Sequence, residues 1–342
     1  MAEAEEAQVH VDAIAELLTT YNELNSCAVD ELEGEPSPLE FMRYVARNTP
    51  FVARRAAAGW RACQTWDAQY LRDVLGHETV NVAVTPMGNA DSPTELEIGD
   101  DGNLVFAKPW EEDQPFAEFL EHVIRQETDP SFPPDAEVRY AQTQNDNLRH
   151  EYLSLFSHVQ RDIPFARVAL QKVPDAINLW VGNSRSVTAL HKDNYENVYV
   201  QVLGRKHFVL LPPPCHPCVN ERSLRPATYR RRLSQGSSSL LALELDGGGD
   251  GGAGVPFPTW DPDRPEENAT AYSTLARPVR VTLNPGDMLY LPAMWYHKVS
   301  QSGSEEGICV AVNYWYDMDF SGPLYPFGNF VRSVYSGQQD RE

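Results

Sequence analysis

The sequence predicts a mainly β protein in which a mixed helical region precedes the sheet-forming part. From about residue 136 onward, short runs rich in Val, Ile, Tyr, Phe and Leu recur along the chain. Glycine and proline separate these runs, which is typical of an antiparallel β-sandwich or barrel. Before residue 136, apolar residues recur mostly at helical spacing. A chain of 342 residues is long enough for one large core with additions, or for two modest domains.

The first third of the chain predicts helices with one strand among them. Apolar periodicity indicates helices at 10–25, 37–48, 67–76 and 114–126, and alternation indicates a strand at 79–86. The second helix has the clearest start, because Ser37 is a typical N-cap and Pro38 suits the first helical position. We therefore expect residues 1–135 to form a mixed helical and α/β region that packs on the sheet-forming core.

The sheet-forming part is expected over 136–325, with a proline-glycine turn at 284–287. The strand pattern lapses between 215 and 278, which contains a glycine-rich stretch of low complexity. We expect 215–278 to be a mobile insertion without a packed core of its own. The apolar residues of 326–342 predict a tail or a short helix, and packing and dimerisation are equally open for it.

Charge and composition exclude several classes of protein. The formal net charge is −21, which repels nucleic-acid phosphates, so direct DNA or RNA binding is not expected. No apolar run reaches the ~18 residues that suggest a membrane span, and the acidic start of the chain is unlike a signal peptide. We expect a cytoplasmic protein, with the nucleus as an alternative.

The five cysteines are too few and too scattered to predict a disulfide framework. Cys215 and Cys218 enclose the stretch CHPC, which looks like half of a zinc site. A structural zinc needs four ligands, and no second cysteine pair accompanies these two. An irregular loop is therefore the better prediction for this stretch.

Two histidines have an acidic residue two positions later, where about 1.3 such pairs are expected by chance. His10 and Asp12 lie in a predicted helix, on which residues two apart do not face each other. His191 and Asp193 lie in a strand-like run, where residues two apart point to one face and can reach the same ion. The second pair is therefore the candidate for metal binding, and the alternative is a surface strand with polar residues facing water.

A third ligand must come from elsewhere in the chain, and His297 is the best candidate. It follows the proline-glycine turn and a strand, so a neighbouring strand can carry it inward. Two imidazoles and one carboxylate form the ligand set suited to non-haem Fe(II) and oxygen chemistry. If 188–201 forms one strand, Asn197 and Tyr199 lie on the same face as His191.

Several motifs of the chain together resemble those of the JmjC-domain oxygenases. They are TALHKD at 188–193, GRKHFVLLPP at 204–213, PGDMLYLPAMWYHKV at 285–299 and VAVNYWYD at 310–317, in the family's order. The resemblance covers most of 36–335 and points to the small hydroxylase branch of the family. It implies a double-stranded β-helix core, of the cupin or jelly-roll type, and the cofactors Fe(II) and 2-oxoglutarate.

The resemblance also implies roles for individual residues. His191, Asp193 and His297 would be the iron ligands, and Lys206 would pair with the distal carboxylate of 2-oxoglutarate. Thr188 and Tyr140 would hydrogen-bond the same carboxylate, and Asn197 and Asn313 would line the pocket. Thr188 lies three residues from His191, so ideal strand parity puts it on the opposite face, and a twist or bulge would have to bring it in.

The activity that the resemblance implies is hydroxylation of a protein side chain, with O₂ consumed and succinate released. The small hydroxylase branch implies lysine, in a basic segment of a GTPase, and an acidic surface is compatible with such a partner. N-methyl-lysine or N-methyl-arginine demethylation on the same scaffold is one alternative, since fold alone does not decide function. A metal-binding cupin that serves as an interaction module without turnover is another, and a homodimer is left open.

Overall fold

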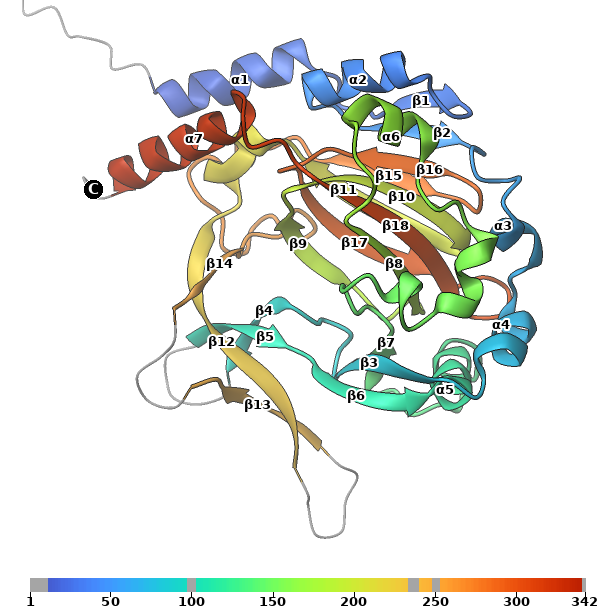
Figure 1. The fold of residues 1–342 in the computed structure, drawn as a ribbon. Coiled ribbons are helices and arrows are strands. Elements are labelled where there is room, and N and C mark those ends of the chain that lie inside the picture. Colours follow the sequence, from blue (N-terminus) through green and yellow to red (C-terminus); the bar gives the residue numbers. More distant parts are fainter. Residues whose placement is uncertain (1–11, 97–102, 233–239, 248–252, 340–342) are drawn as a thin grey trace, which may run out of the picture.

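The core of the protein is a pair of facing β-sheets (Figure 1). The computed structural model describes residues 12–96, 103–232, 240–247 and 253–339. The larger sheet has the order β1-β2-β16-β10-β18-β8, with β1 (Asp30–Glu33), β2 (Phe51–Arg54), β8 (Ala176–Gly182), β10 (Tyr195–Leu203), β16 (Met288–Leu291) and β18 (Cys309–Asp317). The smaller sheet has the order β15-β11-β17-β9, with β9 (Thr188–Lys192), β11 (Arg205–Leu211), β15 (Val279–Leu283) and β17 (Tyr296–Ser302). This arrangement confirms the mainly β, jelly-roll fold.

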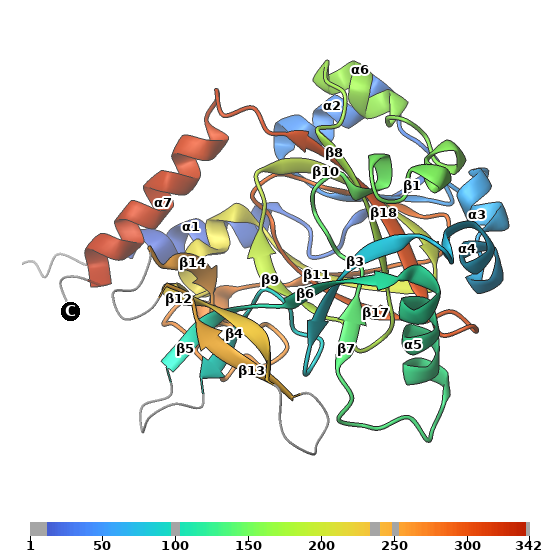
Figure 2. The same cartoon turned by 60° about the horizontal axis from the view of Figure 1, so that its bottom comes forward.

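Two further sheets lie beside this core, and Figure 2 shows β4, β5, β12 and β13 together at one end of the molecule. One has the order β13-β12-β5-β4, with β14 also paired to β12: β4 (Ser92–Leu96), β5 (Asn103–Lys108), β12 (Glu221–Arg232), β13 (Leu240–Leu245) and β14 (Val255–Pro258). The other has the order β6-β3-β7: β3 (Thr79–Thr85), β6 (Trp110–Pro115) and β7 (Val138–Tyr140). Strands from residues 1–135 therefore pair directly with strands from beyond residue 136.

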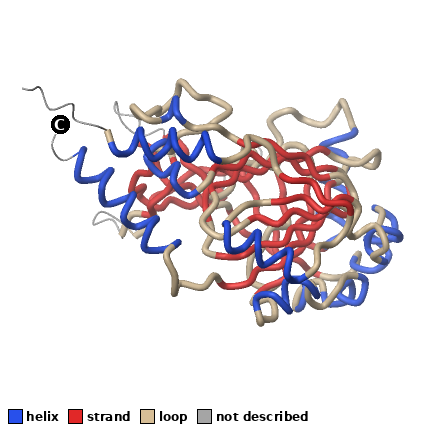
Figure 3. The backbone as a smooth tube through the Cα atoms, turned by 90° about the horizontal axis from the view of Figure 1, so that it is seen from above, coloured by secondary structure: helices blue, strands red, loops and turns tan. Residues whose placement is uncertain are grey.

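Helices lie around the periphery of the strands (Figure 3). The α-helices are α1 (Ala13–Leu24), α2 (Pro38–Arg47), α3 (Arg61–Thr65), α4 (Ala68–Leu75), α5 (Phe116–Thr128), α6 (Pro164–Leu170) and α7 (Leu324–Gln339). The 3₁₀ helices are η1 (Asn147–Arg149), η2 (Leu153–His158), η3 (Pro213–Cys218) and η4 (Ser273–Leu275). None of the helices in the described ranges is long and apolar enough to cross a membrane.

Local sequence signals explain where several elements begin and end. Ser37 Oγ accepts a hydrogen bond from Glu40 N–H at the start of α2, as the N-cap pattern predicted. In the turn at 284–287, Asp287 N–H donates to Asn284 O at 2.9 Å, and Gly286 has φ +89°. A type II turn requires this positive φ at its third residue, so the turn prediction is confirmed.

The larger sheet is buried on both faces, because alternate residues of its strands belong to two different apolar clusters, one on each face. Val198 and Val200 of β10 pack under the helices. Tyr199, between them, faces the smaller sheet and packs near Phe208 of β11. This explains why β10 and β18 read as nearly continuous apolar runs, and it leaves the few polar residues on the inner face to form a site.

We expected 215–278 to be a mobile insertion without a packed core of its own, and its described residues instead form strands that join apolar clusters shared with the rest of the chain. β12 pairs with β13, with β14 and, in parallel, with β5. Ala227 of β12 is buried in a small cluster with Leu96 and Val105. The arginines of β12 lower the hydrophobicity of this segment, so its alternation of buried and exposed residues does not stand out as a strand pattern in the sequence. The glycine-rich stretches at 233–239 and 248–252 lie outside the described residues.

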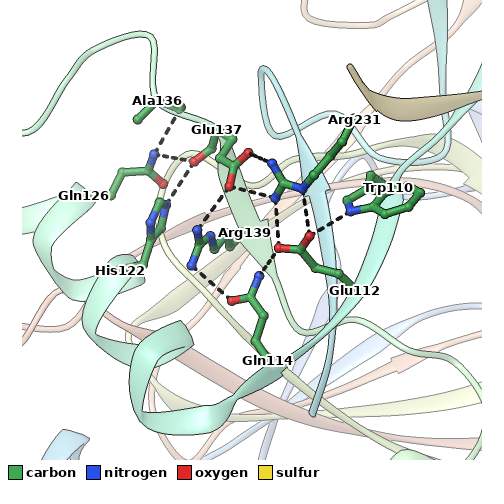
Figure 4. A network of polar contacts seen from close by, with 9 residues as sticks. All are labelled: Trp110, Glu112, Gln114, His122, Gln126, Ala136, Glu137, Arg139 and Arg231. Carbon is green, nitrogen blue, oxygen red and sulfur yellow. Dashed lines mark hydrogen bonds and ion pairs between the residues drawn. The ribbon is translucent and has the colours of Figure 1, made fainter. Parts of the chain in front are cut away.

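A network of ion pairs holds β12 against the neighbouring sheet (Figure 4). Arg231 Nε lies 2.8 Å from Glu112 Oε2 of β6, and Arg231 Nη1 lies 2.9 Å from Glu137 Oε2 beside β7. The hydrogen bonds from Arg231 lower the pKa of Glu112 to about 2. Gln114 and Arg139 extend the network through further hydrogen bonds. The segment is thus joined to the N-terminal region by charge as well as by strand pairing.

Candidate active site

His191, Asp193 and His297 converge at the inner face of the smaller sheet. β17 pairs with β9 in antiparallel register, and His297 lies directly opposite His191. The candidate ligand atoms of the three side chains all lie within 4.8 Å of one another. Among the described residues, this is the one group of three or more His, Cys, Asp or Glu side chains arranged in this way.

Hydrogen bonds orient both imidazoles toward a common point. His191 Nδ1 lies 2.8 Å from Ala189 O, and His297 Nδ1 lies 3.1 Å from Trp295 O. A carbonyl oxygen only accepts, so Nδ1 must carry the proton in each ring and Nε2 keeps its lone pair. Each Nε2 faces Asp193 Oδ2, at 3.6 Å from His191 and 3.7 Å from His297. Two imidazole nitrogens and one carboxylate so arranged fit a divalent transition metal such as Fe(II).

The charges of the three groups agree with a ligand role. Burial, helped by the nearby His191, lowers the pKa of His297 to about 4, so this imidazole is neutral at pH 7. Burial would raise the pKa of Asp193, but the two histidines outweigh it and lower it to about 2. Burial opposes the charged form of His191, yet Asp193 raises its pKa overall. A metal ion that binds these three side chains would therefore have to displace a proton only from His191, and only when that imidazole is charged.

The expectation that 188–201 forms a single strand is wrong. β9 ends at Lys192 and β10 begins at Tyr195 in the other sheet, so Asp193 lies just beyond the end of a strand. Its backbone carbonyl accepts from Met294 N–H at 2.8 Å, which ties this crossing to the segment before β17. Asn197 and Tyr199 still line the same pocket, but they reach it from the facing sheet.

The residues expected around 2-oxoglutarate line one narrow pocket with the triad. Its volume is about 30 Å³, and the members are Tyr140, Thr188, Asn197, Lys206 and Asn313 together with His191, Asp193 and His297. A register irregularity explains the position of Thr188: it pairs with Val299 although His191 pairs with His297, so β9 has one extra residue. This bulge brings Thr188 to the pocket face, against ideal parity.

Lys206 lines the pocket and is only 2% exposed. Its Nζ donates to Tyr140 Oη at 2.9 Å and to Gln301 Oε1 at 2.8 Å. Asn313 accepts from Trp180 Nε1 at 2.9 Å and donates to Asn197 Oδ1 at 3.2 Å. These hydrogen bonds orient Lys206, Asn197 and Asn313, which suits the binding of a charged small molecule.

The cupin-like domain family matches residues 36–322. The human bifunctional peptidase and (3S)-lysyl hydroxylase JMJD7 is 37% identical over 297 residues, which are 86% of this chain and 85% of the human protein. The chain belongs to the cupin-like JmjC family. The Arabidopsis thaliana lysine-specific demethylase JMJ32 is 35% identical over 315 residues, 90% of this chain and 86% of that protein.

Membership of the JmjC family identifies the chain as a 2-oxoglutarate-dependent dioxygenase. JmjC domain-containing protein E of Dictyostelium discoideum is also similar, at 30% identity over 315 residues, 89% of this chain and 88% of that protein. The family generally uses Fe(II) and 2-oxoglutarate, and the triad and the Lys206 pocket of this JmjC chain fit both in donor type and charge.

Gln301 holds the pocket residue Lys206 of this JmjC chain and was not predicted from the sequence. It is 5% exposed, accepts from Lys206 and donates through Nε2 to Asn183 O at 2.7 Å. It lies four residues after His297 on β17, so strand parity places the two on the same face. Strand parity with His297 could have pointed to Gln301 in the sequence. A neutral amide, however, does not differ from the many other polar residues of the chain.

The other residues that the sequence offered as possible metal ligands do not form a second metal site in the described part of the chain. Asp12 caps α1 by accepting from Ile14 N–H, and His10 lies outside the described residues. Cys215 and Cys218 are free and buried in an apolar cluster. Neither belongs to a group of three metal-ligating side chains in the part of the chain that the structure describes.

Proposed function

We propose that this JmjC dioxygenase binds Fe(II) and 2-oxoglutarate and hydroxylates a lysine side chain of a protein substrate. The observation that carries the proposal is the convergence of three metal-ligating side chains and one buried lysine in a single pocket. His191, Asp193 and His297 would hold the iron, and Lys206 would bind the distal carboxylate of 2-oxoglutarate. The bound pair supplies activation of O₂ for oxidation of a C–H bond, with 2-oxoglutarate converted to succinate and CO₂.

The residues of the chain bind and orient what reacts. Lys206 offers a buried ammonium, which suits a carboxylate because no carboxylate of the described residues forms an ion pair with it. Tyr140 and Thr188 would add hydrogen bonds at the same end of the cosubstrate. The aromatic rings of Trp180 and Tyr199, which stack with centroids 6.5 Å apart, narrow the pocket and exclude water.

The choice of a protein lysine draws on the similar proteins and on charge. One relative is named as a lysyl hydroxylase and another as a lysine-specific demethylase. The net charge of −21 favours a basic partner. A lysine in a basic segment of a GTPase is the target that the small hydroxylase branch implies, and we include it in the proposal.

Metal-dependent turnover tests the proposal directly. We expect the purified protein, loaded anaerobically with Fe(II), to release succinate from 2-oxoglutarate on addition of O₂. His297→Ala should abolish this release, whereas His150→Ala should retain it, since His150 is an exposed histidine. Succinate release at the wild-type rate in the His297→Ala variant would contradict the assigned site.

Demethylation of N-methyl-lysine is the second candidate, because the relative JMJ32 is named as a demethylase. Mass spectrometry of a reacted substrate separates the two reactions. Hydroxylation adds one oxygen atom to the lysine, whereas demethylation removes a methyl group and releases formaldehyde. Formaldehyde release without any hydroxylated product would replace hydroxylation by demethylation as the function.

A further inference from the structure

A broad cleft opens beside the proposed metal ligands. Its volume is about 580 Å³, and Thr188, His191 and Asp193 form part of its wall. The cleft therefore offers room for a substrate side chain next to the triad, which the narrow pocket around Lys206 does not. The charges and the apolar surface of the cleft determine which side chains can bind there.

Glu221, one acidic residue of the cleft wall, already has cationic partners. Its carboxylate lies 3.1 Å from Lys192 Nζ and 3.2 Å from Arg332 Nη2, and its side chain is only 8% exposed. A buried carboxylate with two cations beside it has little attraction left for a third. Glu221 is therefore a structural part of the wall and a poor anchor for a basic substrate.

Asp91 lines the same cleft and lacks such partners. Its Oδ2 accepts one hydrogen bond from the neutral amide of Gln142, at 3.1 Å. Among the described residues, no lysine, arginine or histidine nitrogen lies within 4.0 Å of its carboxylate, and Lys108 pairs instead with Asp246 at 2.6 Å. Burial raises the pKa of Asp91, and the Gln142 hydrogen bond and the more distant charges of His191 and Lys108 do not outweigh it.

The backbone at Asp91 is also held in an unfavourable conformation. Its φ is +52°, in the left-handed region that non-glycine residues adopt at an energetic cost. It directly precedes β4, which pairs with β5. The fold thus places a half-buried carboxylate at the cleft without an ion-pair partner. Both the burial of its charge and its left-handed backbone conformation make this position energetically unfavourable.

Apolar surface lies in the same cleft. Phe106 of β5 and Phe257 of β14 pack with ring centroids 5.1 Å apart, and Pro256 and Pro258 flank Phe257 in the wall. Such a surface suits methylene groups, and aromatic rings also attract a cation through their faces. An unpaired carboxylate combined with an apolar wall matches a side chain that has an apolar stem and a positive end.

We propose that Asp91 selects lysine, with its carboxylate binding the substrate ammonium while the Phe106 and Phe257 surface packs against the methylene stem. This inference rests on the proposed function and adds a residue that determines its specificity. The ammonium supplies the cation that Asp91 lacks, and the two groups form a charge-assisted hydrogen bond. A neutral side chain of similar length would cover Asp91 and leave it unpaired, which disfavours its binding.

Binding of two matched probes tests this assignment without requiring turnover. N-acetyl-lysine methylamide and N-acetyl-norleucine methylamide differ in the terminal ammonium. Their affinities are measured by saturation-transfer difference NMR on the full-length protein with diamagnetic Zn(II) and 2-oxoglutarate. We expect the wild type to bind the lysine probe at least ~10-fold more tightly than the norleucine probe. A tenfold difference in affinity is the size of effect that one charge-assisted hydrogen bond of ordinary strength produces.

In the Asp91→Asn variant we expect this preference to fall to about twofold, because the amide keeps the shape and loses the charge. Asp73→Asn removes one charge from an exposed residue of α4 and should leave the preference unchanged. Equal binding of the two probes by the wild type overturns the assignment, whatever the stability of the variants. An unchanged preference in a folded Asp91→Asn variant overturns it as well.

The two proposals fail in different ways. Absence of metal-dependent succinate release by the wild type counts against the proposed function and does not touch the probe comparison. Succinate release together with equal affinity for the two probes leaves the dioxygenase intact and removes only the assignment to Asp91.

Discussion

Replacement of Lys206 by methionine should separate stability from cosubstrate binding. The ammonium of Lys206 is buried, and no carboxylate of the described residues pairs with it. Its Nζ donates hydrogen bonds to Tyr140 Oη and Gln301 Oε1, and it lies 5.4 Å and 5.8 Å from the ring centroids of Tyr140 and Tyr199. Methionine has similar length and no charge, so Lys206→Met removes the buried charge and both bonds together.

The expected change in stability follows from two opposing contributions. Burying an ammonium without a counter-charge costs several kcal/mol. The two hydrogen bonds of a charged donor return about 1.5–3 kcal/mol each. These contributions nearly cancel, so the variant without ligand should lie within about 2 kcal/mol of the wild type. At 100 times its Kd, 2-oxoglutarate should stabilise the wild type by about 2.7 kcal/mol, and the variant should lack this stabilisation.

Urea denaturation with Mn(II) present, with and without 2-oxoglutarate, measures both quantities. Lys172→Met is the matched control, because Lys172 is an exposed lysine that bonds only a backbone carbonyl, that of Asp317. The control should keep the full stabilisation by 2-oxoglutarate. If Lys206→Met also keeps it, the distal carboxylate is not bound by Lys206 and the reasoning is refuted.

Two further substitutions test the pocket and the segment around β12. Gly182→Ala would place a Cβ 2.6 Å from Tyr140 Cδ2 and 2.8 Å from Gln301 Nε2, so these two side chains would have to move. We expect the KM for 2-oxoglutarate to rise ~10-fold and the fold to be destabilised by about 1–3 kcal/mol. An unchanged KM would contradict this, because it would mean that Tyr140 and Gln301 can move without loss of 2-oxoglutarate binding. Because Arg231 lowers the pKa of Glu112 from 4.5 to about 2, this pair stabilises the fold above pH 4.5 and loses its effect as pH falls toward 2. Arg231→Leu should therefore lower the free energy of unfolding, measured by urea denaturation, more at pH 5 than at pH 3, with a difference of roughly 1–2 kcal/mol after allowance for solvent screening. An equal loss at both pH values would contradict the assigned charge effect.

Much of the fold could be predicted because its signals are local. The proline-glycine turn, the Ser37 cap and the period-two runs each depend on neighbouring residues, and the structure agrees with them. The motif order likewise sufficed to predict the JmjC family, which the similar proteins confirm. Local rules failed in 215–278, where Arg231 of β12 pairs with Glu112 and Glu137, which lie far away in the sequence.

The candidate site divides in the same way. Residue types and spacing along the chain were enough to single out His191, Asp193 and His297, because a chelating pair and a third imidazole are properties of sequence. Only the tertiary structure decided that β9 carries a bulge, that the chain crosses between sheets at Asp193, and that Gln301 contacts Lys206. Register and the approach of two sheets depend on packing summed over the whole core, and no short stretch of sequence contains that information.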